Sequence, residues 1–245
     1  EGLYQIDNLG KSVEISSDGN VLAVGAPNHD SHKGQVSIFQ NDNGTWTQIG
    51  NDIYGDASYS YSGTSISLSS DGTIVAIGAH EYSSGTPGNL LENSGRVNIY
   101  QNENGSWKKI GIIDGGARSE YSGYSVNLSS DGSIVAIGSI GSNPYKRYTG
   151  ESTTPEFNDN LYRGSVRIYQ NDSGNWNQVG NDIFGKSKGD NLGRSVGISS
   201  DGSIVAVSAY DNDNSSSKGY VTIYQNERGT WTQIGEDIIG EAVGD

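Results

Sequence analysis

Residues 125–138 read SVNLSSDGSIVAIG, and three close variants of this stretch occur in the same chain: SVEISSDGNVLAVG at 12–25, SISLSSDGTIVAIG at 65–78 and SVGISSDGSIVAVS at 195–208. The four SSDG tetrads are separated by 53, 60 and 70 residues. Self-similarity over a few tens of residues is typical of repeat architectures. The sequence therefore predicts four copies of one structural unit.

Each copy contains four segments that are typical of strands. The first, such as Ser12–Ser16, alternates polar and apolar residues, and the Asp-Gly pair after it predicts a two-residue hairpin. The second, such as Ile134–Gly138, is apolar on both faces, as a strand buried from both sides should be. The third alternates again, as in Val97–Tyr100, and a second tight turn leads into a fourth segment that opens with tryptophan. All four tryptophans occupy this one place: Trp46, Trp107, Trp176 and Trp231.

A four-stranded antiparallel meander repeated in this way is the unit of a β-propeller blade. We therefore expect an all-β fold, a β-propeller of four blades forming a single domain over residues 1–245. The expected blades are 9–55, 62–116, 122–185 and 192–240. Because an unpaired blade face would expose a large apolar patch, we expect the fourth blade to close onto the first. The alternatives are an open β-array, a sandwich with duplicated halves, or part of a longer array.

One part of the first copy matches a known repeat. GKSVEISSDGNVLAVGAP followed by GQVSIFQ resembles the FG-GAP repeat of integrin-α-type propellers, in its Gly-x-Ser-Val start (10–13), its VGAP strand (24–27) and its Gly-x-Val-x-Ile-aromatic strand (34–39). Only the first copy keeps the proline of GAP. Calcium-binding members of that family carry several acids in the loop where each copy here has one carboxylate, so we expect those calcium sites to be absent. These single carboxylates are Asp18, Asp71, Asp131 and Asp201.

Composition and charge narrow the function classes. The formal net charge is −14, so nucleic acid and anionic membranes are poor partners. There is no cysteine, which excludes disulfides and Cys-ligated metals. No apolar run approaches the roughly 18 residues that cross a bilayer. Three Asn-x-Ser/Thr sequons at tight turns, Asn43, Asn104 and Asn171, are candidate glycosylation sites and favour a secreted, extracellular protein. Methionine is absent even at position 1, which indicates a processed or excised chain.

The two ends of the predicted blades differ. One end consists of near-identical tight turns, and the other carries the variable loops 27–33, 80–94, 140–163 and 210–218. Rigid scaffolds commonly carry function on such loops, so this loop end is the predicted binding face. Its tyrosines suit a sugar ring or a protein partner, although any single one could simply cover a blade edge. The predicted ligand-binding residues are Tyr59, Tyr61, Tyr82, Tyr121, Tyr145, Lys146, Arg147, Tyr148, Tyr162, Arg163 and Tyr210.

These patterns favour a secreted, non-catalytic module that binds a glycan or an extracellular protein, as in cell adhesion. The alternative is a structural subunit of an extracellular filament or surface assembly, with self-association. Asp211 and Asp213 alternate with amides as in a calcium loop, but the central glycine and distal acid are missing, so no metal site is predicted. We expect no cofactor, no catalytic residue and no enzyme, and His29, His32 and His80 are interpreted as solvated loop residues.

Overall fold

The computed structural model describes residues 6–141, 163–210 and 218–242, and these form an all-β protein. The first sheet contains β1 (Ser12–Ile15), β2 (Val21–Ala26), β3 (Gln35–Asp42) and β4 (Thr45–Gln48), with β5 (Ile53–Tyr54) beside β3. The second contains β6 (Ser65–Leu68), β7 (Ile74–Ala79), β10 (Arg96–Glu103) and β11 (Ser106–Asp114). A hairpin of β8 (Ser84–Thr86) and β9 (Asn89–Leu91) is inserted between β7 and β10.

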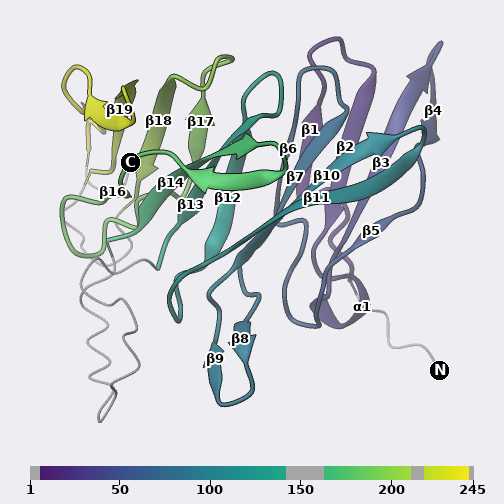
Figure 1. Cartoon of the computed structure of the whole chain (residues 1–245), viewed down its shortest axis with the longest axis horizontal. Helices are drawn as coiled ribbons and strands as arrows, with labels where there is room; N and C mark the ends of the chain where they lie inside the picture. Colours follow the sequence, from purple (N-terminus) through teal and green to yellow (C-terminus); the bar gives the residue numbers. More distant parts are fainter. Residues whose placement is uncertain (1–5, 142–162, 211–217, 243–245) are drawn as a thin grey trace.

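The other two sheets follow in the same order. The third contains β12 (Ser122–Leu128), β13 (Ile134–Ser139), β14 (Ser165–Asp172) and β15 (Asn175–Gln178), with β16 (Ile183–Phe184) beside β14. The fourth contains β17 (Val196–Ile198), β18 (Ile204–Ala209), β19 (Tyr220–Glu227) and β20 (Thr230–Gln233), with β21 (Ile238–Ile239) beside β19. Figure 1 shows the sheets side by side in chain order, from the purple first sheet to the green and yellow fourth. In the described residues the only helix is the irregular turn α1 (His29–His32), so none could cross a membrane.

The two kinds of tight turn differ in conformation. In the Asn-Gly type both central residues have positive φ, as for Asn43 (51°) and Gly44 (91°), which is the two-residue hairpin geometry. In the Asp-Gly type only the glycine does, and Gly19 N–H donates to the carbonyl of Ser16. The expected two-residue Asp-Gly hairpin is therefore wrong. Ser16 Oγ instead bonds Asp18 (2.6 Å) and accepts from Val21 N–H (2.9 Å), which stabilises a four-residue turn.

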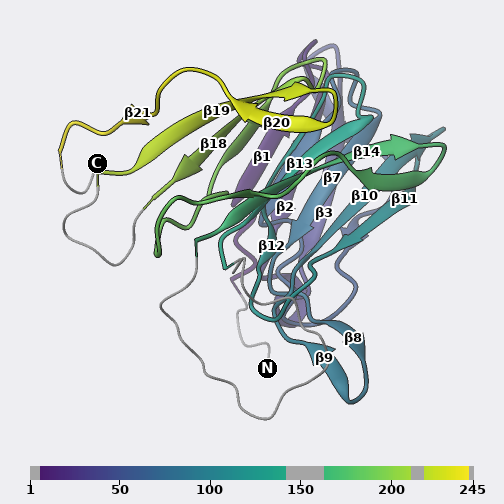
Figure 2. The ribbon, with the colours of Figure 1, turned by 60° about the vertical axis from the view of Figure 1, so that its left-hand side comes forward.

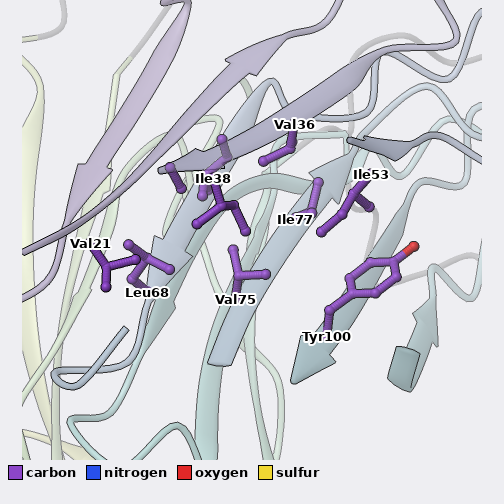
Figure 3. Packing of buried hydrophobic residues seen from close by; sticks show 10 residues of the cluster. Val21, Val36, Ile38, Ile53, Leu68, Val75, Ile77 and Tyr100 are labelled. Carbon is purple, nitrogen blue, oxygen red and sulfur yellow. The ribbon is translucent and has the colours of Figure 1, made fainter. Parts of the chain in front are cut away.

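The hydrophobic core lies between neighbouring sheets. The predicted two-sided burial of the second strand is confirmed, since Val75, Ala76 and Ile77 of β7 are each 0% exposed. Figure 3 shows Val75 and Leu68 of the second sheet packed against Ile38 of the first. Burying each such side chain contributes about 1.5–3 kcal/mol. The core is thus a series of sheet-to-sheet interfaces.

Close backbone approach is what joins one sheet to the next. Gly78 in β7 has room for no Cβ, because that atom would collide with the carbonyl oxygen of Gly123 at the start of β12. Gly25 and Gly138 meet the following sheet in the same way, against Gly63 and Gly193. The small residues of the second strand are therefore required by sheet packing.

Hydrogen bonds between sheets repeat from one interface to the next. At the tight-turn end, Ser17 N–H donates to Ser70 O, Ser70 N–H to Ser130 O, and Ser130 N–H to Ser200 O. At the loop end, Ser12 Oγ donates to the carbonyl of Gly63 (2.7 Å), and Ser65 and Ser125 do the same to Gly123 and Gly193. At the outer edge a tryptophan bonds the preceding sheet at two of the three interfaces: Trp107 Nε1 donates to Ile49 O and Trp231 Nε1 to Val179 O. Trp176 Nε1, at the interface between them, is buried without a hydrogen-bond partner among the described residues.

Within the described residues, the fourth sheet does not close onto the first, contrary to expectation. Val13 of β1 is 60% exposed, whereas Ile66, its counterpart in β6, is 8% exposed. Ile238 of β21 is 62% exposed, whereas its counterpart Ile53 in β5 is 7% exposed. Figure 1 shows the first sheet at the right of the molecule and the fourth at the left, and Figure 2, turned so that the left-hand side comes forward, shows β19 and β20 in front. The close glycine contacts set the turn from each sheet to the next, and four such sheets leave the circle open.

Candidate functional site

The first strand of each sheet, which is β1, β6, β12 or β17, begins at the loop end with the same backbone turn. Its first residue has positive φ in every sheet: Asn8 (57°), Tyr61 (53°), Tyr121 (56°) and Asn191 (48°). Non-glycine residues adopt this conformation infrequently, and bulky tyrosines rarely do, so the surrounding structure must hold them there. The residue three positions later differs among the sheets: Lys11, Thr64, Tyr124 and Arg194. One repeated turn therefore presents a different side chain from each sheet.

A row of aromatic and imidazole rings connects these turns. His32 of α1 packs on Tyr61 with ring centroids 4.8 Å apart, and Tyr61 lies 6.0 Å from His80. His80 in turn lies 5.4 Å from Tyr124, edge to face. Tyr121 also contacts His80, at 6.3 Å. We call His80, Glu81, Tyr61, Tyr121, Tyr124, Lys11 and Arg194 the axial cluster.

His80 is the chemically distinctive member of the axial cluster. It follows β7 directly, its side chain is 14% exposed, and its Nε2 lies 3.7 Å from Glu81 Oε1. Burial, with the Lys11 charge nearby, lowers the pKa of His80 to about 4. Its Nδ1 is buried and has no hydrogen-bond partner in the described part of the chain. Such an imidazole is neutral near pH 7, so one of its two ring nitrogens carries a lone pair.

The neighbours of His80 are also perturbed. Burial raises the pKa of the Glu81 carboxyl, against the opposing effect of His32. The pKa of Tyr61 is raised by burial, by Glu81 and by Tyr59. Perturbed groups gathered at one place are typical of functional sites, although structural networks also produce them. The cluster therefore combines a neutral base with a carboxylate that would stabilise its protonated form.

Two cations lie near the row of rings, Lys11 close enough to affect His80 and Arg194 beside Tyr124. Lys11 is exposed at the start of β1, and Arg194 is exposed just before β17. The Arg194 guanidinium lies 5.6 Å from the ring centre of Tyr124 and 5.1 Å from that of Tyr210. Cations at these distances are attracted to the ring faces, which positions Arg194 beside the row of rings. Positive groups so placed could stabilise negative charge that develops on a substrate oxygen.

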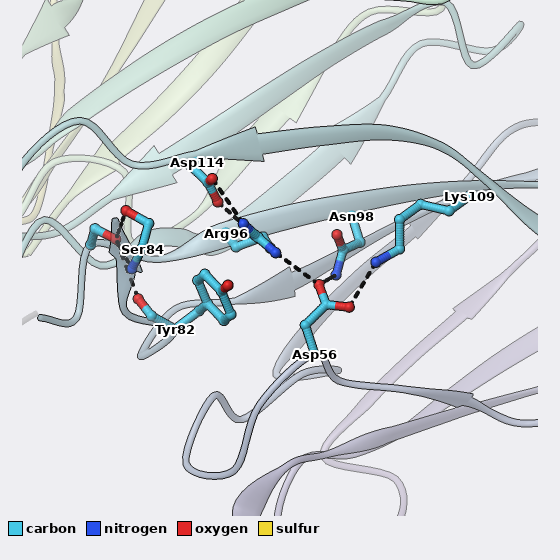
Figure 4. Close-up of polar contacts among 8 residues, drawn as sticks. Asp56, Tyr82, Ser84, Arg96, Asn98, Lys109 and Asp114 are labelled. Carbon is cyan, nitrogen blue, oxygen red and sulfur yellow. Dashed lines mark hydrogen bonds and ion pairs between the residues drawn. The ribbon is translucent and has the colours of Figure 1, made fainter. Parts of the chain in front are cut away.

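The structure separates the residues predicted to bind a ligand. Tyr61 and Tyr121 lie in the axial cluster, Tyr59 stacks on His32 at 5.6 Å, and Tyr210 joins through Arg194. Tyr82 does not join them, because its ring lies under the Arg96 guanidinium, 3.9 Å away, as Figure 4 shows. Arg163 lies before β14, and its carbonyl accepts from Leu192 N–H. Tyr145, Lys146, Arg147, Tyr148, Tyr162 and the two aspartates Asp211 and Asp213 lie outside the described residues.

The interpretation of His80 as a solvated loop residue is wrong, because its side chain is only 14% exposed. Loop position alone suggested solvated residues, because a sequence does not reveal which loops pack against one another. One usable signal was present: His80 stands where the other repeats have Pro27, Ile140 and Tyr210, so it is a polar substitution at a repeat position.

Two networks of ion pairs contain the acidic and basic residue types of catalytic sites, but they stabilise the fold. Arg96 bridges Asp56 (3.1 Å) and Asp114 (2.6 Å), and Lys109 also reaches Asp56, as in Figure 4. These contacts tie the second sheet to the link that precedes it.

The second network surrounds Glu120, which is 1% exposed and pairs with Arg167. Glu120 Oε2 also accepts the backbone N–H groups of Gly116 (2.7 Å) and Ala117 (2.9 Å). Burial raises the pKa of this carboxyl, although Arg167 and the two N–H groups oppose the rise. All its oxygens are engaged by the protein, so Glu120 holds the link before β12.

Other parts of the molecule offer less chemistry. A crevice of about 480 Å³ lies at the outer edge between the first two sheets, beside Trp107, Tyr100 and Asp52. In the described ranges, no group of three His, Cys, Asp or Glu side chains is placed to hold a metal ion. Asn43 and Asn104 lie exposed in the Asn-Gly turns, and Asn171 Oδ1 caps Gly174 N–H; their glycosylation stays a prediction.

Comparison with known proteins links the fold to lactonases. No protein-family model matches the chain, and no curated protein matches it. Among solved structures, a protein assigned as a 6-phosphogluconolactonase from Bacteroides uniformis is 15% identical with a TM-score of 0.59; the match covers 94% of this chain and 55% of that one. The periplasmic gluconolactonase PpgL of Pseudomonas aeruginosa is 17% identical with a TM-score of 0.60, over 95% of this chain and 58% of that one. The chain thus spans a little over half the length of these neighbours.

These neighbours correct several sequence-based expectations. The FG-GAP resemblance is wrong, because the similar structures are lactonases. Its glycines and small residues are those that close packing of sheets demands, as at Gly25 and Gly78, so they do not identify a family. The expected non-enzymatic module for cell adhesion or carbohydrate binding, with a glycan or protein partner, is overturned by the same finding, as is the alternative of a structural assembly subunit. Two of the tyrosines predicted to bind a ligand, Tyr61 and Tyr121, lie beside His80, and their role in binding stays a prediction.

Proposed function

We propose that the chain forms blades of a β-propeller hydrolase that opens a small cyclic ester, with the axial cluster as its active site. In this proposal the four sheets are four blades, close to 9–55, 62–116, 122–185 and 192–240, each a meander with its first strand nearest the axis. The fold shared with proteins named as lactonases supports the reaction class. The neutral, buried imidazole of His80 beside Glu81 is the observation that carries the assignment of the site.

The proposed reaction is addition of water to the ester carbonyl. In this step Nε2 of His80 accepts a proton from the water as the water oxygen bonds to the carbonyl carbon, because Nδ1 is buried. The Glu81 carboxylate, 3.7 Å from Nε2, stabilises the imidazolium. Negative charge on the carbonyl oxygen is stabilised by Arg194 or by tyrosine hydroxyls at the same end. The ring C–O bond then breaks, and the alkoxide takes the proton back from His80. The product is an open-chain hydroxy acid.

The test is hydrolysis of a panel of five- and six-membered lactones, followed by proton release. The His80→Gln variant should lose about 100-fold or more in kcat/KM, in the range of general acid–base contributions. His29→Gln is the matched control. His29 lies outside the axial cluster and pairs with Asp7, 3.0 Å from it, so this variant should keep full activity. Wild-type protein that opens no lactone, or His80→Gln with unchanged activity, would overturn the proposal.

We also propose that the protein works outside the cytoplasm. One of the solved structures that resemble this chain is named as a periplasmic gluconolactonase. Fractionation of the source cells followed by immunodetection tests this, and a purely cytoplasmic signal contradicts it.

A further inference from the structure

Two of the hairpin turns at the tight-turn end contain asparagine followed by glycine, at Asn43 and at Asn104. This dipeptide readily loses the side-chain amide, because glycine has no Cβ to hinder attack by its own backbone nitrogen. We propose that Asn104 is a site of spontaneous deamidation in the folded protein, and that hydrogen bonds hold the other Asn-Gly and Asp-Gly turns against the same chemistry. The proposal does not depend on the proposed reaction at the axial cluster.

The reaction uses only the chain and water. The backbone nitrogen of Gly105 attacks Cγ of Asn104 and forms a five-membered imide, and the Gly105 N–H proton leaves with the side-chain NH2 group as ammonia. Water then adds to either carbonyl of the imide, and the C–N bond of that carbonyl breaks. The product is aspartate or isoaspartate. One amide and one water thus become one carboxylic acid and one ammonia.

Both Asn-Gly turns carry one common restraint on this attack. In each, the glycine N–H donates to the asparagine two residues before the pair, which is Asn41 in the first turn (2.7 Å) and Asn102 in the second (2.8 Å). The nitrogen must give up this bond before it can reach Cγ, so the bond slows both turns to a similar extent. The same bond occurs in the other two hairpins, whose central residues Ser173 and Arg228 have no amide to lose.

The two asparagines differ in what holds the side-chain amide. Asn43 Nδ2 donates to the carboxylate of Asp42 (2.9 Å). Glu103 stands at the equivalent place before Asn104, but its carboxylate is paired with Lys108 (3.1 Å). The Asn104 side chain is exposed and has no hydrogen-bond partner among the described residues. Its amide can therefore turn toward the nitrogen of the next residue.

The Asp-Gly turns are closed to the reaction by their own hydrogen bonds. Attack on an aspartate requires a protonated carboxyl group, because an ionised carboxylate is a poor electrophile. Ser16 Oγ (2.6 Å) and Asn20 N–H (3.0 Å) both donate to one oxygen of Asp18, and these bonds lower its pKa to about 2. Asp114, which also precedes a glycine, gives both carboxylate oxygens to Arg96. The serine bond is present in the other three turns, at Asp71, Asp131 and Asp201.

Deamidation of Asn104 would act on the contact between the first and second sheets. A Cβ built on Gly50 of the first sheet would lie 2.4 Å from the carbonyl oxygen of Gly105, so the two backbones touch at this turn. Trp107, two residues further on, donates to the carbonyl of Ile49 across the same contact (3.0 Å). Isoaspartate adds one methylene to the backbone here, and either product adds a negative charge. The modification therefore weakens the contact between these two sheets.

The experiment follows the full chain by peptide mapping and mass spectrometry during weeks of incubation at neutral pH. The protein is made in a host without N-glycosylation, because a glycan on either asparagine blocks the reaction. Asn104 should be converted roughly 3- to 10-fold faster than Asn43, which is the factor that one hydrogen bond supplies. The Asp-Gly peptides should contain no isoaspartate over the same time.

Two variants test the bonds that the proposal invokes. Asp42→Ala removes the partner of the first amide and should bring its rate of loss to that of Asn104. Asn102→Ala releases the glycine nitrogen and should raise the rate at Asn104 by roughly 3- to 10-fold. Glu103→Ala is the matched control: Glu103 is paired with Lys108, so this variant should leave the rate at Asn104 unchanged. Thermal melts confirm that each variant is folded.

Unfolded protein separates the role of the structure from that of the local sequence. In concentrated urea these hydrogen bonds are absent, so Asn43 and Asn104 should react at similar rates. A ratio of rates in urea equal to that in the folded chain overturns the proposal. So do equal rates at the two residues in the folded chain, a folded chain that keeps Asn104 intact while the unfolded chain is converted, isoaspartate in the Asp-Gly turns, or an Asp42→Ala variant with an unchanged rate at Asn43.

Discussion

At the tight-turn end, the four sheets make the same bonds four times; at the loop end, one repeated backbone turn carries four different side chains. Ser16, Ser69, Ser129 and Ser199 all bond the aspartate two residues later. By contrast, the loop-end turns place Lys11, Thr64, Tyr124 and Arg194 at one equivalent position. Residues that are identical in all four repeats therefore stabilise the fold. Residues that differ at the same backbone position are the ones that can serve a specific function.

The largest loss of stability should come from disrupting the close backbone contact between neighbouring sheets. Gly78→Val places a side chain against the carbonyl of Gly123 and should cost more than about 3 kcal/mol, enough to prevent folding. Gly197→Ala is the control, because nothing lies within 4 Å of its Cβ position, and its effect should stay within about 0.5 kcal/mol. Urea unfolding measures both. Equal effects at the two glycines would contradict the role of close backbone approach.

The next largest loss of stability should come from Glu120, which holds the segment before β12 and has no identical counterpart in the other repeats. Glu120→Ala leaves Arg167 without one of its partners and removes the acceptor for two N–H groups, so we expect a loss of about 3–5 kcal/mol. Glu92→Ala is the control, since its exposed pair with Arg118 at 3.2 Å should contribute under about 1 kcal/mol. Thermal melts of both variants decide the matter. A small loss for Glu120→Ala would show that this network is dispensable.

The free energy of unfolding should depend on pH through His80, which lies at the loop end. Because the pKa of His80 is lowered from 6.5 to about 4, the unfolded chain binds a proton between these pH values that the folded chain does not. The free energy of unfolding therefore falls as pH drops from 6.5 toward 4. The His80→Asn variant should lack this part of the dependence, a difference on the order of 2–3 kcal/mol. Urea titrations at several pH values measure it, and parallel curves for both proteins would refute a buried neutral imidazole.

The smallest effect should be the most uniform. Ser129→Ala removes the hydroxyl that bonds Asp131 (2.7 Å) and caps Ile134 N–H (3.0 Å), and should cost about 1 kcal/mol. The same substitution at Ser69 should cost the same, since its bonds are 2.7 and 2.9 Å. Tyr124→Phe at the loop end should leave stability nearly unchanged. Unequal costs at the two serines would weaken the equivalence of the sheets.

Local patterns predicted much of the fold and little of the site. Alternation and the two-sided apolar strands predicted the segments that became β6 and β7, since these patterns record burial residue by residue. The Asp-Gly turn was predicted with the wrong geometry, because Ser16 and Asp18 stabilise a longer turn through side-chain bonds that the dipeptide rule ignores. The axial cluster was only half predicted. Its tyrosines were recognised, but His80 was not, because its burial and lowered pKa arise from loops of separate sheets.

The sequence by itself determined the unit: four repeats, their strands, their tight turns and the place of the tryptophans. It could do so because strand pairing within a unit depends on residues close together in the chain. Only the tertiary structure decided how the units meet. Whether the circle closes, whether Trp46 is covered and what surrounds His80 depend on the turn between neighbouring sheets. That turn is set by contacts such as Gly78 against Gly123, between residues far apart in sequence.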